Sequence, residues 1–231
     1  MIYLAVVAHP DDEVLGAGAT LYKLAKEGHK VHVCILSGSV KARENRPRIS
    51  VLKENIISSS KILGIKKVMI GDFPNLEFNT VPHLQLAKML ENVITTSEAD
   101  IVITHHPSDL NKDHLYTSLA CQSAVRMIQQ KENETIPVKE LLYMEIPAST
   151  DWGINRAMNS FNPNTFIEVG EEGVLKKIEA LTQYTGVIRD YPHPRSEEAI
   201  KSLAAYRGCQ AGMVYAEAFE CVFRRVLDFI F

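Results

Sequence analysis

The sequence lacks the features that mark membrane proteins and nucleic-acid-binding proteins. No apolar stretch in its 231 residues approaches the ~18 residues of a membrane span. The apolar run at residues 2–8 is short and has no basic leader, so we expect no signal peptide. The 25 Lys and Arg residues nearly balance the 28 Asp and Glu residues, which gives a formal net charge of -3. This near-neutrality argues against a partner such as nucleic acid or anionic lipid.

Cysteine is also scarce. The four residues Cys34, Cys121, Cys209 and Cys221 lie far apart and form no CxxC pair. Cys34 has apolar neighbours on both sides, in Val33-Cys34-Ile35. We therefore expect reduced thiols in a cytoplasmic protein, and neither disulfides nor a thiolate metal site.

What the chain does contain is an alternation of short apolar runs with amphipathic stretches. Strands are expected at residues 2–8, 30–36, 67–70, 101–104, 140–146 and 166–169, and a final apolar segment runs over residues 216–223. Helices are expected at residues 15–26, 49–63, 84–94, 114–129, 174–184 and 197–207, the last ended by Gly208, and a long loop at 147–163. Strands that alternate with helices of this length favour an α/β fold. We expect a Rossmann-like, mostly parallel sheet with helices on both faces and a C-terminal α/β elaboration, in one domain over residues 1–231.

A cluster of an imidazole and three acids directly follows the first expected strand. It reads Ala8-His9-Pro10-Asp11-Asp12-Glu13. In open parallel sheets, ligands bind at the carboxyl ends of strands, and neighbouring buried carboxylates need a cation or a proton to coexist. The alternative is a solvated loop in which Asp11 or Asp12 caps the following helix.

A second cluster follows the strand at 101–104. Residues 105–114 read His-His-Pro-Ser-Asp-Leu-Asn-Lys-Asp-His. If the sheet is parallel, both clusters lie on the same rim. Imidazole with carboxylate and no thiolate suits Zn²⁺ or another divalent first-row ion such as Fe²⁺, Mn²⁺ or Co²⁺. The two clusters together therefore predict a metal site that the fold assembles.

These residues resemble the LmbE-like/PIG-L family of zinc-dependent N-deacetylases. The resemblance rests on residues 8–13 after an apolar strand and on the distant Asp113-His114 pair. It extends to Pro-Arg-Ser at 194–196 and Tyr-Ala-Glu-Ala-Phe at 215–219, and so covers most of the chain. Members of this family remove acetyl groups from N-acetylated amino sugars in glycolipids, low-molecular-weight thiols and antibiotic precursors. The resemblance implies a hydrolase that releases acetate from a conjugate of the N-acetylglucosamine type.

The resemblance also implies roles for individual residues. His9, Asp12 and His114 correspond to the metal ligands, and Asp11 to the general base that activates a metal-bound water. Adjacent acids could exchange roles, so Asp11 as ligand with Asp12 as base stays open. Asp113 belongs to the catalytic set, where it would orient a ligand or hold the base in place.

One position departs from the family pattern. Several members carry a histidine three residues before the third ligand, where this chain has Asn111. Asn111 can donate a hydrogen bond to substrate but cannot act as an acid. We therefore expect another group, His193, to protonate the leaving amine or stabilise the oxyanion. The alternative for His193 is a rigid turn between two prolines.

Substrate binding is expected from the loop after the second strand. Arg43 and Arg46 lie there, and arginine forks suit sugar hydroxyls, phosphates or carboxylates. The alternative is a solvated basic loop. Asn75, after the third strand, is a further candidate to face the substrate.

Two other functions compete with the deacetylase. One is a non-catalytic α/β protein that binds a sugar or a nucleotide, with structural acids. The other is a metallohydrolase that acts on a different amide or on an ester. The expected partner is a small N-acetylated sugar, and the sequence leaves formation of a homo-oligomer open.

Overall fold

The computed structural model describes residues 1–39, 47–130, 138–154 and 160–226. Its strands are β1 (Ile2–Val7), β2 (Lys30–Ile35), β3 (Lys67–Ile70), β4 (Ile101–His105), β5 (Glu140–Met144), β6 (Thr165–Glu168) and β7 (Ala216–Arg224). Its α-helices are α1 (Asp12–Lys26), α2 (Ile49–Ile62), α3 (His83–Ser97), α4 (Lys112–Gln129), α5 (Gly170–Thr182) and α6 (Glu197–Ala211). Two short 3-10 helices are η1 (Phe78–Thr80) and η2 (Thr150–Trp152).

The seven strands form one sheet in the order β3-β2-β1-β4-β5-β7-β6. Strands β1 to β5 pair in parallel, whereas β7 is antiparallel to both β5 and β6. The antiparallel pair comes from the last third of the chain and extends the parallel sheet. The expected fold class, a mostly parallel α/β sheet with a C-terminal elaboration, is confirmed.

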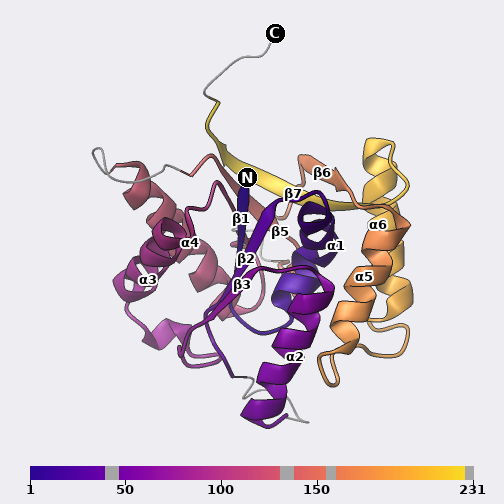
Figure 1. The fold of residues 1–231 in the computed structure, drawn as a ribbon, viewed down its shortest axis with the longest axis horizontal. Helices are drawn as coiled ribbons and strands as arrows, with labels where there is room; N and C mark the ends of the chain where they lie inside the picture. The colour runs from indigo at the N-terminus through magenta and orange to yellow at the C-terminus, as the bar shows by residue number, and fades with distance from the viewer. Residues whose placement is uncertain (40–46, 131–137, 155–159, 227–231) are drawn as a thin grey trace.

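Helices cover both faces of the sheet, and β1 shows why. Its residues Tyr3, Ala5 and Val7 are buried in a core with residues of α1, α2 and α5. The alternate residues Leu4 and Val6 are buried in a second core with residues of α3 and α4. Figure 1 shows α3 and α4 on one side of the sheet and α1, α2, α5 and α6 on the other. A strand buried on both faces is apolar at every position, as the run at residues 2–8 is.

Several helix boundaries differ from the sequence prediction, and α5, for example, begins at Gly170 and not at residue 174. The differences in α1 and α6 have identifiable reasons. Helix α1 begins at Asp12 and not at residue 15, because its first turn carries acids and no apolar periodicity. Helix α6 runs past Gly208 to Ala211 and ends at Gly212, which has a φ of 71°. Gly208 lies inside the helix and does not end it. Glycine is needed there because a Cβ would come within 2.6 Å of the Met213 carbonyl oxygen. The backbone after α6 thus packs directly on this glycine.

The topology places the two polar clusters side by side. Strands β1 and β4 are neighbours in the sheet, although β2 and β3 lie between them in the sequence. The chain continues from β1 to one side of the sheet and from β4 to the other, which makes this junction a topological switch point, where open α/β sheets bind ligands. In the described ranges, no helix is long and apolar enough to cross a bilayer.

Candidate active site

In the loop after β1, a left-handed residue and two backbone amides fix the positions of the acidic side chains. Asp11 has a φ of 96°, a left-handed conformation that is uncommon outside glycine. Its amide donates to Glu13 Oε2 at 3.1 Å, and the amide of His9 donates to Asp12 Oδ2 at 2.9 Å. Asp11 occupies the position before α1, but its side chain makes no capping hydrogen bond. The geometry therefore does not match the alternative in which Asp11 serves as a helix cap.

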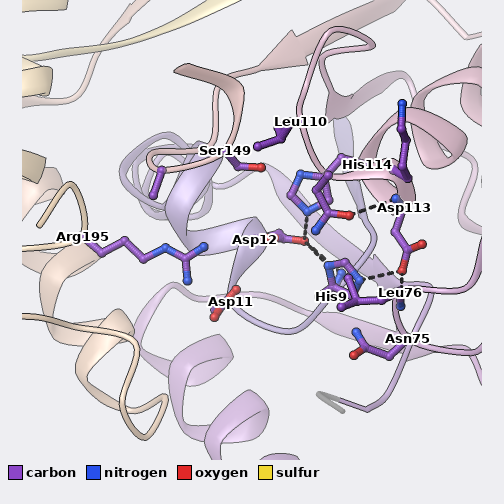
Figure 2. A pocket seen from close by; sticks show the side chains of 13 residues that line it. His9, Asp11, Asp12, Asn75, Leu76, Leu110, Asp113, His114, Ser149 and Arg195 are labelled. Carbon is purple, nitrogen blue, oxygen red and sulfur yellow. Dashed lines mark hydrogen bonds and ion pairs between the residues drawn. The ribbon is translucent and has the colours of Figure 1, made fainter. Parts of the chain in front are cut away.

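Three predicted metal ligands converge on one point. His9 Nδ1 lies 3.4 Å from Asp12 Oδ2, and His114 Nε2, from the first turn of α4, lies 3.2 Å from the same oxygen. One ligand atom from each of the three residues lies within 4.8 Å of the others, and all three side chains are buried. Figure 2 shows both imidazoles facing the Asp12 carboxylate. The structure thus brings together His9, Asp12 and His114, as the sequence predicted.

The donor set fits a divalent ion. The Nε2 atom of His114 is buried, faces the other two ligands and has no aligned hydrogen-bond partner, which is a costly arrangement unless a cation satisfies it. Two imidazoles and one carboxylate are a ligand set of catalytic zinc sites, which keep a further position open for water. The same set suits other first-row divalent ions.

Two further carboxylates contact the two histidines. Asp113 Oδ2 lies 2.9 Å from His9 Nε2, and its two oxygens also accept the amides of Leu76 at 2.6 Å and Phe78 at 3.0 Å. Asp109 Oδ2 lies 3.0 Å from His114 Nδ1. A carboxylate on the far nitrogen of a ligating histidine fixes its tautomer and raises its basicity. Asp113 therefore contacts the ring of His9, the contact that an orienting role would need, and that role stays a prediction.

Asp109 is itself fixed by the loops around it. Its carboxylate accepts the hydroxyls of Ser149 and Thr150, the latter at 2.7 Å, and the amide of Asn111 at 2.8 Å. The sequence analysis gave Asp109 no role. Its available signal was an acid in the same loop as a candidate ligand, five positions before His114.

A second group of His105, Asp109 and His114 also has ligand spacing. His105 Nε2, however, accepts the amide of Ala8 at 2.9 Å, and its ring stacks on His114 with centroids 3.9 Å apart. Burial, with the adjacent His114, lowers the pKa of His105 to about 3. A neutral His105 with Nε2 engaged carries its hydrogen on Nδ1, which cannot then ligate. His105 thus packs beneath the site.

Electrostatics at the cluster favour a positive charge at its centre. Burial opposes ionisation of Asp12, but His114 and His9 outweigh it and hold the pKa of that carboxyl well below its usual range. Burial likewise opposes protonation of His114, yet Asp12 and Asp109 raise its pKa to about 10. The carboxylates thus favour a positive charge at this site, which is either a proton on His114 or a metal ion that replaces that proton.

Glu13 lies behind this cluster. Burial raises its pKa to about 8, with help from Asp11 and Asp12 and against the hydrogen bond of Tyr184. The Tyr184 hydroxyl donates to Glu13 Oε1 at 2.6 Å. Glu13 therefore connects the backbone of Asp11 to the segment after α5.

The metal cluster forms part of the lining of a cavity of about 490 Å³. The other polar residues in its wall are Asp11, Asn75, Asn111, Lys112, Asp113, Ser149 and Arg195. Figure 2 shows the Arg195 guanidinium reaching toward Asp11, between the loop before α6 and the loop after β1. Asn111 begins α4, where its side chain accepts the Asp113 amide at 2.9 Å. Asp11 and Asn111 therefore lie in one cavity with the predicted ligands.

Three predicted site residues, His193, Arg43 and Arg46, are not among those that line this cavity in the described part of the chain. His193 is exposed and absent from the cavity lining, and its Nδ1 accepts the Arg195 amide at 3.0 Å within the turn that ends at Ser196. Its catalytic role stays a prediction. Arg43 and Arg46 lie outside the described residues. Sequence reasoning missed Arg195 as a cavity residue, because the direction of side chains in a proline-bounded turn leaves no periodic signal.

Comparison with known proteins agrees with this site. The family described as PIG-L, GlcNAc-PI de-N-acetylase, matches residues 4–125, which include both clusters. The Escherichia coli K12 protein named uncharacterized deacetylase YaiS is 31% identical over 189 residues, which cover 78% of this chain and 89% of YaiS.

Solved structures share the fold at low identity. One is GalB, the 4-carboxy-2-hydroxymuconate hydratase from Pseudomonas putida KT2440, at a TM-score of 0.79 and 22% identity over 100% of this chain and 99% of that one. Another is the N,N'-diacetylchitobiose deacetylase of Pyrococcus horikoshii, at a TM-score of 0.76 and 19% identity over 96% and 83%. On the family match over more than half of its length, and on its identity with YaiS, this chain belongs to the PIG-L (LmbE-like) family.

Proposed function

We propose that the protein is a metal-dependent N-deacetylase that releases acetate from an N-acetylated amino sugar conjugate, with Zn²⁺ as the expected ion. The observation that carries the proposal is the buried His9–Asp12–His114 set beside Asp11 in one cavity. The family and the names of YaiS and the chitobiose deacetylase support it. The shared fold alone does not choose the reaction, because GalB, named a hydratase, is equally similar in fold.

Each group near the ion has a task in this reaction. His9, Asp12 and His114 would hold the ion, which acidifies a bound water and polarises the acetyl carbonyl. Asp11 lies beside the ligands without being one of them, and its carboxylate would accept the proton of the attacking water as general base. Asp113 and Asp109 keep the two imidazoles in the ligating orientation.

The developing oxyanion and the leaving amine need a donor. His193 is the group that the sequence analysis proposed, and from its turn it would have to swing into the cavity. Arg195, two residues further on, already lines the cavity, so we assign to it the stabilisation of the oxyanion in the transition state. The proton that Asp11 would accept from the water is then available to the amine as the C–N bond breaks. A variant pair, His193→Ala and Arg195→Ala, separates the two by which of them lowers kcat.

The test combines metal content with acetate release. Protein purified without chelator is assayed on N-acetylglucosamine and its glycosides, beside His9→Ala, His114→Ala and the control His83→Ala, an exposed histidine bonded to Ser123. We expect metal and turnover to be lost together in the first two variants and kept in the control. A metal-free wild type, or full turnover in His114→Ala, contradicts the proposal. Metal binding without acetate release favours a metallohydrolase of another amide or ester.

A further inference from the structure

Strained backbone gathers at the cavity. Among the described residues, four that are not glycine have a positive φ, namely Asp11, Leu76, Glu98 and Ala148. Glu98 ends α3, but the other three line the cavity. Left-handed backbone in such residues is unfavourable and persists only where the surroundings impose it. Such outliers cluster at ligand sites. Leu76 and Ala148 are not metal ligands, so their left-handed backbone in the cavity wall suggests a role in binding another part of the ligand.

The surroundings of Leu76 do impose its conformation. Its φ is 61°, and its amide donates to Asp113 Oδ2 at 2.6 Å. That carboxylate is the one that contacts His9. In this conformation the Leu76 residue lines the cavity and is 48% exposed.

Leu110 presents a second apolar side chain from a different loop. It is 60% exposed and lines the same cavity. Its amide bonds to the carbonyl of Ser149 at 3.4 Å, which joins the loop after β4 to the segment that carries Ala148. Figure 2 shows Leu110 and Leu76 on two sides of the His and Asp cluster. The floor of the cavity is therefore charged, and apolar side chains flank that floor.

This distribution matches a ligand with two unlike ends. The acetamido group must reach the metal cluster, and a cavity of about 490 Å³ falls within the range of about 300–1,000 Å³ that pockets for much larger molecules occupy. Exposed leucines in a wall gain free energy only from an apolar partner. Building on the proposed deacetylase function, we propose that Leu76, Leu110 and Ala148 form an aglycone subsite, and that the substrate is an N-acetyl glycoside with an apolar aglycone.

Binding to an inactive protein tests the subsite separately from the reaction. Metal-loaded Asp11→Asn protein is titrated with phenyl and with methyl N-acetyl-β-glucosaminide by calorimetry. We expect at least about tenfold tighter binding of the phenyl glycoside, as an apolar pocket gives for one added apolar group. Adding Leu76→Asn, in which asparagine tolerates left-handed backbone, or Leu110→Ser should reduce that preference to about twofold while binding of the methyl glycoside is kept.

The control is Leu84→Asn, an equally exposed leucine on α3 that does not line the cavity. It should retain the full preference. Equal affinity for the two glycosides, no binding of either, or a preference that survives both cavity substitutions overturns the subsite. Absence of acetate release by the wild type, with the phenyl preference intact, would instead overturn the proposed deacetylase and leave the subsite standing.

Discussion

Asp113 offers the sharpest test of how the site is organised, because it can be isolated as a support for the metal. Its carboxylate accepts three donors: His9 Nε2 at 2.9 Å, the Leu76 amide at 2.6 Å and the Phe78 amide at 3.0 Å. In Asp113→Asn the amide oxygen can replace only one carboxylate oxygen. The new NH₂ group then faces a donor, and His9 loses its negative partner.

The magnitudes follow from these contacts. One buried amide without an acceptor costs about 1–3 kcal/mol, and a chain of this size loses about 2–4 °C in Tm per kcal/mol, so we expect Tm to fall by about 2–12 °C. Loss of a carboxylate that orients a ligand weakens metal affinity by about 10- to 100-fold. Turnover at limiting metal should fall accordingly and recover when metal is saturating, because Asp113 acts through His9 and not on the substrate.

The assay is acetate release as a function of free Zn²⁺, beside a Kd from competition with a chelator. The control is Asp100→Asn, a carboxylate that accepts the Ile2 amide at 2.8 Å and pairs with Lys139 at the opposite end of β1. It should lower Tm without changing the metal Kd. If Asp113→Asn keeps its metal affinity and stays inactive at saturating Zn²⁺, the residue contacts substrate directly, and our reasoning is wrong.

Three further predictions concern other groups. Asp11→Asn should retain metal but lose about 10²- to 10⁴-fold in kcat, as loss of a general base does; near-native kcat would remove that role. Burial raises the pKa of the Cys34 and Cys121 thiols to about 12, so iodoacetamide at pH 8 should label exposed Cys209 and spare both by mass spectrometry. Glu13, with a pKa of about 8 in the fold against 4.5 ordinarily, keeps a proton that the unfolded chain has released between these values. The free energy of unfolding of metal-free protein should therefore fall as pH rises from 5 to 8, with a further contribution above about pH 6.5 from His114, whose pKa is raised to about 10. In urea titrations Glu13→Gln should reduce the slope between pH 5 and 6.5, where His114 is protonated in both states.

Much of this molecule could be predicted because its signals are periodic. The buried strands are continuous apolar runs, and the helices between them repeat every 3.6 residues, so the parallel sheet and its polar rim followed directly. His9, Asp12 and His114 could be placed together because each comes just after a strand or begins the helix that follows one. The structure adds the order β1-β4 that makes those two loops adjacent.

The rest depends on contacts that leave no period in the sequence. Asp109, which contacts His114, is held by hydrogen bonds from the hydroxyls of Ser149 and Thr150 in the segment after β5. Gly208 reads as a helix end, yet it serves the close approach of Met213. The turn at 189–196 puts Arg195 in the cavity and His193 outside, a choice that side-chain direction makes and residue type does not.

The sheet order has a consequence for how the site comes into being. In the sequence 104 positions separate His9 from Asp113, and the pairing of β4 with β1 is what brings their loops together. Long-range parallel pairing is intrinsically slow. A chelatable ion offered during refolding would find no complete set of ligands before that event. The rate of metal binding during refolding would therefore measure the rate at which β4 pairs with β1.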